Sequence, residues 1–188
     1  MSATTKPRLL LHCCCAPCAT YVIDYLKKDY NISLFFYNPN IEPPEEYERR
    51  KGELIKLIER AGYGSEIAIL ENDYDNAVFK DAVQSLQDQP EGGVRCAVCC
   101  GLRLDETAKR AKAEGYDIFT TTLSVSPHKN AEMLNELGTK AKEKHGGNYL
   151  RADFKKNDGY LRSVEFTLKY GLLRQNYCGC KNSIRQEK

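Results

Sequence analysis

Residues 7–28 read PRLLLHCCCAPCATYVIDYLKK, an apolar run followed by a group of cysteines and then by a proline-led segment. The run Leu9-Leu10-Leu11 predicts a short buried strand over 7–12. Pro17 predicts a helix over 18–28, because proline is tolerated in the first turn of a helix, where its missing N–H costs little. The stretch therefore predicts a strand, a turn made of cysteines, and a helix.

The rest of the chain repeats this alternation of strand and helix. Further strands are predicted at 32–37, 65–70, 117–122 and 148–152, and helices at 44–61, 96–114, 130–144 and 159–170, with one more that Asp73 or Asp75 caps and that runs to about 86. Strands separated by helices predict an open parallel sheet flanked by helices, a Rossmann-like α/β fold. Because no linker or repeat interrupts the pattern, we expect one metal-binding catalytic domain over residues 1–188.

The cysteines are the most unusual feature of the composition. They fall into three groups: Cys13, Cys14, Cys15 and Cys18; Cys96, Cys99 and Cys100; Cys178 and Cys180. Nine is an odd number, and no signal peptide is predicted, which argues against a disulfide framework in a chain of 188 residues. We therefore expect metal binding in the cytoplasm. We also expect no membrane partner, since no segment approaches the ~18 apolar residues of a membrane helix.

The predicted fold brings these groups together. In an open parallel sheet, ligands bind beyond the carboxyl ends of the strands. The first cysteine group follows the first strand, residues 38–40 follow the second, and residues 153–156 follow the fifth. The second cysteine group opens a helix, and helix N-termini lie near the same edge. We expect the cysteines to converge there as a metal site.

The number of thiols bears on the metal. Cys96 and Cys99 are one helical turn apart, and the glycine between Cys178 and Cys180 permits the tight turn that two ligands of one site require. A zinc ion takes four ligands. A larger number of thiols favours two metal centres or a multi-iron cluster. Cysteine chemistry alone leaves zinc and iron open.

Two further features concern the partner. A nucleotide-binding domain would carry a glycine-rich phosphate loop after its first strand. The cysteines and proline found there disfavour an ATP-using enzyme. Residues 151–188 hold nine Lys/Arg and four Asp/Glu, an excess of 9 − 4 = +5 in a chain of net charge +2. This basic segment suits a polyanion such as RNA, although a solvated tail explains the same charge.

Several motifs resemble one known family, the QueH epoxyqueuosine reductases. In order they are LLHxCCxPC (10–18), YNPNI (37–41), RCxxC (95–99), FTTTL with SP (119–123 and 126–127), DFKK (153–156) and RQxYCGC (174–180). The resemblance implies reduction of the epoxide of epoxyqueuosine to the alkene of queuosine at the wobble position of tRNA, without cobalamin. It also implies a 4Fe-4S cluster with a second iron ion, a low-potential electron donor, and a fold similar to the tRNA-thiolating enzymes.

The resemblance and the residue chemistry together assign roles. The expected metal ligands are Cys14, Cys15, Cys18, Cys96, Cys99, Cys178 and Cys180, with Cys13 and Cys100 as bystanders. Asp153 is a candidate for metal ligation or proton relay, or alternatively a helix cap or a partner of Lys155. His12 is a candidate proton donor, or alternatively a core histidine. Expected substrate-binding residues are Tyr37, Asn38 and Asn40 for the base and Lys155, Lys156 and Arg174 for phosphate. Alternatively, residues 37–40 form a plain turn at the end of a strand.

Two other functions fit the cysteines. One is a zinc-binding module that binds tRNA without catalysis. The other is a thiol–disulfide enzyme that uses Cys178-Gly179-Cys180 or Cys96-x-x-Cys99 on a dithiol substrate.

Overall fold

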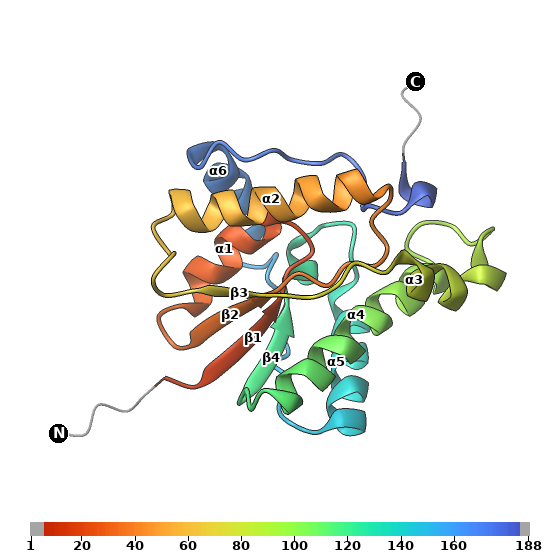
Figure 1. Ribbon diagram of the computed structural model, residues 1–188, viewed down its shortest axis with the longest axis horizontal. Coiled ribbons are helices and arrows are strands. Elements are labelled where there is room, and N and C mark those ends of the chain that lie inside the picture. Colours follow the sequence, from red (N-terminus) through yellow and green to blue (C-terminus); the bar gives the residue numbers. More distant parts are fainter. Residues whose placement is uncertain (1–5, 185–188) are drawn as a thin grey trace.

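A parallel sheet forms the centre of the protein. The computed structural model describes residues 6–184. Its sheet contains β1 (Arg8–His12), β2 (Asn31–Phe35), β3 (Ala68–Leu70) and β4 (Ile118–Thr121), in the order β3-β2-β1-β4. Each neighbouring pair is parallel. Helices cover both faces (Figure 1), which confirms the predicted open α/β fold.

The helices form two layers, one on each face of the sheet. On one face lie α1 (Ala16–Leu26), α2 (Pro44–Arg60) and α6 (Gly159–Lys169), and on the other lie α4 (Val94–Ala113) and α5 (Ala131–His145) (Figure 1). The short α3 (Asn76–Ala82) precedes α4, and 3-10 turns occupy 84–86, 122–125 and 181–183. Within residues 6–184, no helix combines the length and the apolar character needed to cross a membrane.

Strand β1 is buried on both faces, as its sequence predicts. Leu9 and Leu11 belong to the core beneath α1 and α2, whereas Leu10 belongs to the core beneath α4 and α5. All three leucines are fully buried. Successive side chains of a strand point to opposite faces, so an unbroken apolar run suits a strand covered by helices on both sides.

The order of the strands creates a crevice beside β1. The chain passes from β1 to β2 and then to β3 on one side, and later returns to place β4 on the other side of β1. Such a switch point is where ligands bind in open α/β sheets. The segments after β1 and β4 meet there: the backbone N–H of Cys14 donates to the hydroxyl of Thr122 at 3.2 Å.

The predicted strand at 148–152 is wrong. Only one bridge joins this segment to the sheet, between Tyr149 and Phe119. Beyond it the chain bonds to α5, since the backbone N–H of Ala152 donates to Asn135 Oδ1 at 3.0 Å. The Tyr149 ring also packs where a Cβ on Gly138 would stand, 2.2 Å away. Contacts with α5 therefore replace the ladder that a fifth strand would need.

Candidate metal centre

The first cysteine group lies in the turn between β1 and α1. Cys15 precedes the first residue of α1, and Cys18 lies in its first turn. The sulfur atoms of Cys14, Cys15 and Cys18 all lie within 4.8 Å of one another. A strand end followed directly by a helical turn thus gathers three thiols that are near neighbours in the sequence, and these three could hold a metal ion.

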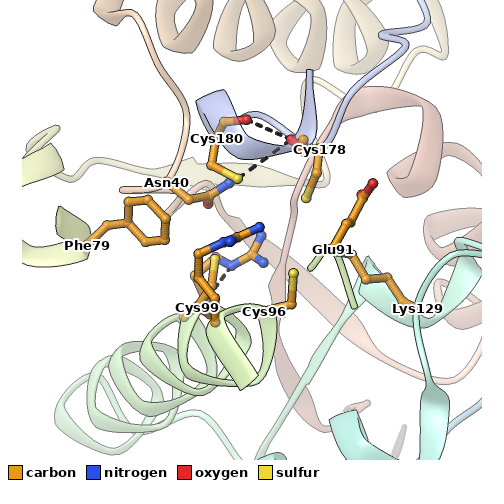
Figure 2. Close-up of a pocket in the computed structure, with 11 residues that line it drawn as sticks. Asn40, Phe79, Glu91, Cys96, Cys99, Lys129, Cys178 and Cys180 are labelled. Carbon is orange, nitrogen blue, oxygen red and sulfur yellow. Dashed lines mark hydrogen bonds between the residues drawn. The ribbon is translucent and has the colours of Figure 1, made fainter. Parts of the chain in front are cut away.

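The second and third cysteine groups share a small cavity. Cys96 and Cys99 lie on the first turns of α4, and Cys178 and Cys180 lie in the C-terminal loop opposite them (Figure 2). Asn40 and Phe79 also line this cavity. The spacing of three residues places Cys96 and Cys99 on the same side of the helix. Four sulfurs from two distant stretches thus face the same space.

A set of contacts holds the loop that carries Cys178 and Cys180. The side chain of Arg50, only 3% exposed, donates from Nη1 to the carbonyl of Cys178 at 3.0 Å and from Nη2 to that of Tyr177 at 3.2 Å. Glu46 pairs with Arg50 at 2.6 Å and so fixes its direction. The backbone N–H of Glu42 donates to the carbonyl of Gly179 at 3.0 Å. Helix α2 and the segment before it therefore position both sulfurs.

A larger, open cavity of about 320 Å³ adjoins the first group. Its wall includes Cys14, Cys15 and Cys18, and Cys178 lines both cavities. The other residues that matter for chemistry here are polar or aromatic: Glu91, Ser126, His128, Lys129, Tyr160, Arg174, Gln175, Asn176 and Tyr177. Cys178 thus links the two groups of sulfurs, as the predicted convergence requires.

Two buried cations face these sulfurs. Arg103 is 1% exposed and Lys129 is 8% exposed, and neither forms an ion pair with a carboxylate within residues 6–184. Burial by itself lowers the pKa of Lys129, but negative charge on the sulfurs of Cys178 and Cys100, where they are thiolates, outweighs burial and raises the pKa above its usual value. Buried charges without a partner are costly. A negatively charged group bound in the cavity would therefore stabilise these two cations.

The thiol of Cys99 does not supply that charge by itself. Burial raises the pKa of Cys99 to about 12, so its free thiol stays protonated. A bound metal deprotonates its cysteine ligands. The unneutralised cations and the sulfur-rich donor set therefore both fit a thiolate-bound metal centre.

The first cysteine group differs from the cysteines of the small cavity, because its thiols form hydrogen bonds with one another. Hydrogen bonds from the thiols of Cys14 and Cys18 lower the pKa of Cys15 well below its usual value. The hydrogen bond to Cys15 raises the pKa of Cys14 to about 11. Cys15 is therefore the sulfur of this group that ionises most readily, which suits a metal ligand.

His12 lies in the core rather than in a cavity wall. Its Nε2–H donates to the carbonyl of Tyr37 at 3.0 Å, which leaves Nδ1 to accept the hydroxyl of Thr121 at 2.8 Å. Burial, followed by the charge of Arg103, lowers its pKa to about 4. A neutral imidazole that ties together the ends of three strands fits the core-histidine alternative, and its role as a proton donor stays a prediction.

Asp153 pairs with a lysine of its own turn. The Nζ of Lys155 donates to Asp153 Oδ1 at 2.8 Å and to the carbonyl of Ser124 at 3.3 Å. Asp153 lines neither cavity. These contacts favour the ion-pair alternative for Asp153 and occupy Lys155, while the catalytic role of Asp153 stays a prediction.

The residues expected to bind substrate are dispersed. Tyr37 stacks on Phe35 with ring centroids 5.6 Å apart. Asn38 is buried, donates to the carbonyl of Cys13 at 2.8 Å and accepts from Arg103 at 3.4 Å. Asn40 faces the small cavity, and Lys156 is exposed. Of the six, only Arg174 lines the open cavity, where its guanidinium lies 5.2 Å from the ring centroid of Tyr160.

Sequence reasoning missed several residues that line the cavities. Lys129 and Glu91 line both of them, and His128 and Tyr160 line the open one. The segment after β4, Ser126-Pro127-His128-Lys129, could have been found by the rule that ligands bind beyond strand ends. Arg103 gave no such signal, because an arginine in the middle of a helix is usually exposed.

Fold and site define a cysteine-rich parallel α/β protein with a candidate metal centre at the switch point of its sheet. Comparison with known proteins gives the family. The family model described as epoxyqueuosine reductase QueH matches residues 9–186. The chain belongs to this family of oxidoreductases.

Individual relatives support the same family assignment. The epoxyqueuosine reductase QueH of Streptococcus pyogenes serotype M1 is 42% identical over 186 residues, which cover 98% of this chain and 73% of the relative. That of Staphylococcus aureus (strain Mu50) is 40% identical, with 97% and 78% covered. That of Thermotoga maritima is 34% identical, with 96% and 93% covered. The resemblance drawn from the sequence motifs is therefore confirmed.

Proposed function

We propose that this chain removes the epoxide oxygen of epoxyqueuosine in tRNA and so forms queuosine. The reaction takes two electrons and two protons, breaks two C–O bonds, forms an alkene and releases water. The observation that supports it most strongly is the convergence of sulfurs from three stretches on two adjoining cavities that share Cys178, in a chain of the QueH family. The open cavity gives the modified nucleoside access to the sulfurs.

The cofactor of this proposal is an iron–sulfur cluster with a second iron ion. The residues that would hold them are the sulfurs around the two cavities: Cys14, Cys15, Cys18, Cys96, Cys99, Cys178 and Cys180. Such a centre supplies electrons at low potential and a Lewis-acidic iron that polarises a C–O bond. Seven thiols exceed the four that a zinc ion uses.

The protein residues orient the substrate and manage charge. Tyr160 and Tyr177 offer aromatic surfaces for a base turned out of the anticodon loop. Lys129 lines both cavities, stays charged and can donate a hydrogen bond to the epoxide oxygen. Glu91 also lines both cavities and can relay a proton from solvent. The electron donor is a low-potential carrier.

One experiment tests this function. The protein is loaded with iron and sulfide without oxygen, and incubated with epoxyqueuosine-tRNA and dithionite. We expect a brown protein with stoichiometric iron, and queuosine in the digested tRNA. A colourless protein that holds zinc and binds tRNA without turnover would support the zinc module instead. Metal-free reduction of a dithiol substrate would support a thiol–disulfide enzyme.

A second prediction concerns the tRNA. Replacing Arg174 and Lys156 together by alanine removes two exposed cations, one at the open cavity. The slope of log affinity against log salt is negative, and each lost phosphate contact should make it less negative by about 1 and weaken binding of all tRNAs alike. Filter binding at several salt concentrations measures both. Lys109→Ala, on the exposed distal half of α4, serves as the control and should leave the slope unchanged. An unchanged slope in the double variant would move the RNA surface elsewhere.

A further inference from the structure

Three consecutive buried threonines, which end β4 and begin the turn after it, use their hydroxyl groups differently. The hydroxyl of Thr120 donates to the carbonyl of Leu150 at 2.9 Å. That of Thr121 donates to Nδ1 of His12 at 2.8 Å and accepts from the backbone N–H of Leu123 at 3.2 Å. These two hydroxyls therefore join parts of the core to one another. The third hydroxyl faces a cysteine.

The hydroxyl of Thr122 contacts the same cysteine twice. Its oxygen accepts from the backbone N–H of Cys14 at 3.2 Å and lies 3.4 Å from the sulfur of that residue. Thr122 is 0% exposed, and within residues 6–184 its hydroxyl has no other hydrogen-bond partner. Since the oxygen already accepts the N–H, its own O–H remains free to donate, and the sulfur of Cys14 is the acceptor within reach.

Cys14 belongs to the cysteine group that can hold a metal ion. The sulfurs of Cys14, Cys15 and Cys18 lie within 4.8 Å of one another, and no other such group of ligands occurs in the described part of the chain. Cys14 lines the open cavity, whereas Thr122 lines neither cavity and lies behind the sulfur. A change at Thr122 therefore acts on this sulfur without touching a substrate in the open cavity.

The direction of the contact between hydroxyl and sulfur depends on the state of the sulfur. A free thiol can be donor or acceptor, and the thiol of Cys14 also reaches the sulfur of Cys15 at 3.7 Å. A metal-bound cysteine is a thiolate, which carries no proton and only accepts. The Thr122 O–H is then the donor, while its oxygen keeps the backbone N–H of Cys14.

We propose that Thr122 donates its hydroxyl to the sulfur of metal-bound Cys14 and, by accepting the backbone N–H of the same residue, fixes the direction of this ligand. Thr122 is thus a positioning residue of the metal centre. The assignment rests on the proposed function for the identity of the metal, but not for the hydrogen bond itself. Outer partners of this kind raise metal affinity, and hydrogen bonds to sulfur help to set the potentials of iron–sulfur centres.

The test compares three variants of similar shape. Thr122→Val keeps the branched side chain and removes the hydroxyl, whereas Thr122→Ser keeps the hydroxyl and removes the methyl group. Thr120→Val is the matched control, because it removes a buried hydroxyl two residues away that contacts no cysteine. The probe is Co²⁺ alone, titrated without oxygen into reduced, metal-free protein, and thiolate-to-cobalt absorption reports the binding. Cys15→Ser identifies the absorption that comes from the first cysteine group.

Thr122→Val should bind Co²⁺ about 10- to 100-fold more weakly, the usual cost of losing an outer partner of a metal ligand. Its thiolate-to-cobalt band should move to longer wavelength, because a sulfur without the hydrogen bond gives up electron density more readily. Thr122→Ser and Thr120→Val should keep the affinity and the band of the wild type. In the iron-loaded protein, Thr122→Val should have a lower reduction potential, since the hydrogen bond stabilises the more negative, reduced state.

Thermal unfolding of the metal-free proteins shows whether the valine variants fold, and Thr122→Ala replaces Thr122→Val if the latter does not. Three results would overturn the proposal: a Thr122 variant without the hydroxyl that binds Co²⁺ as Thr120→Val does, a Thr122→Ser protein as weak as Thr122→Val, or a band that Cys15→Ser leaves unchanged. If Co²⁺ binding depends on Thr122 as expected but the wild type forms no queuosine, the proposed function fails and the hydrogen bond stands.

Discussion

Cys99→Ser should abolish the conversion of epoxyqueuosine-tRNA and lower the iron content of the protein. Cys99 is 7% exposed and shares the small cavity with Cys96, Cys178 and Cys180. A serine hydroxyl does not ionise to replace a thiolate ligand. Losing merely an outer partner of a ligand costs about 10- to 100-fold in metal affinity or activity, so losing the ligand should cost at least about 100-fold. Iron analysis and single-turnover assays measure the two effects.

Cys100 provides the control for this experiment. It is the next residue on α4, but it is fully buried in the core beneath that helix and lines neither cavity. Cys100→Ala should keep its iron and most of its activity. If Cys99→Ser retained full iron and full turnover, Cys99 would not be a ligand, and the small cavity would not be the metal centre.

Gly179→Ala should have the second largest effect, through the backbone rather than through a ligand. Gly179 has φ of +130°, which side chains rarely adopt, and an added Cβ would stand 2.8 Å from Ile41 Cγ1 and 3.1 Å from Asn40 Nδ2. The conformation alone costs about 1–2 kcal/mol for an alanine. Relief of the contact requires the loop to shift, which displaces Cys178 and Cys180 together. Iron per chain should therefore fall by half or more after reconstitution.

Gly147→Ala separates strain from displacement of the cysteines. Gly147 also has a positive φ, +87°, but a Cβ there would meet nothing within 4 Å. It follows α5 and lines neither cavity. This variant should lose about 1 kcal/mol of stability and bind iron as the wild type does. Equal iron contents in the two glycine variants would show that the backbone of the Cys178–Cys180 loop does not position the ligands.

Much of the fold was predicted because its signals are local. The leucines of β1, the proline at the start of α1 and the cap of α3, where Asp75 accepts from the N–H of Ala77 at 2.9 Å, each act within a few residues. The prediction of a strand at 148–152 was wrong because the deciding contacts are not local. The residues of this segment suit a strand, but Asn135 and Gly138, more than ten positions earlier, determine which partner its backbone takes.

The candidate site also has features that local sequence predicts and features that depend on packing. That the first two cysteine groups would meet at the end of a parallel sheet followed from the sequence, since the first adjoins a predicted strand end and the second a predicted helix start, whereas Cys178 and Cys180 adjoin neither. The partners of polar side chains did not follow. The bonds of His12 to Thr121 and Tyr37, and the pairing of Asp153 with Lys155, exist only after packing.

The sequence by itself determined the class of fold, the family and the thiols available for metal, because strand period, helix starts and cysteine spacing are properties of neighbouring residues. Only the tertiary structure decided that Cys178 joins the two groups, that Arg103 and Lys129 leave positive charge beside the sulfurs, and that Asn40 faces them without a partner. Burial and hydrogen-bond partners depend on which distant segments come into contact, and no local pattern records that.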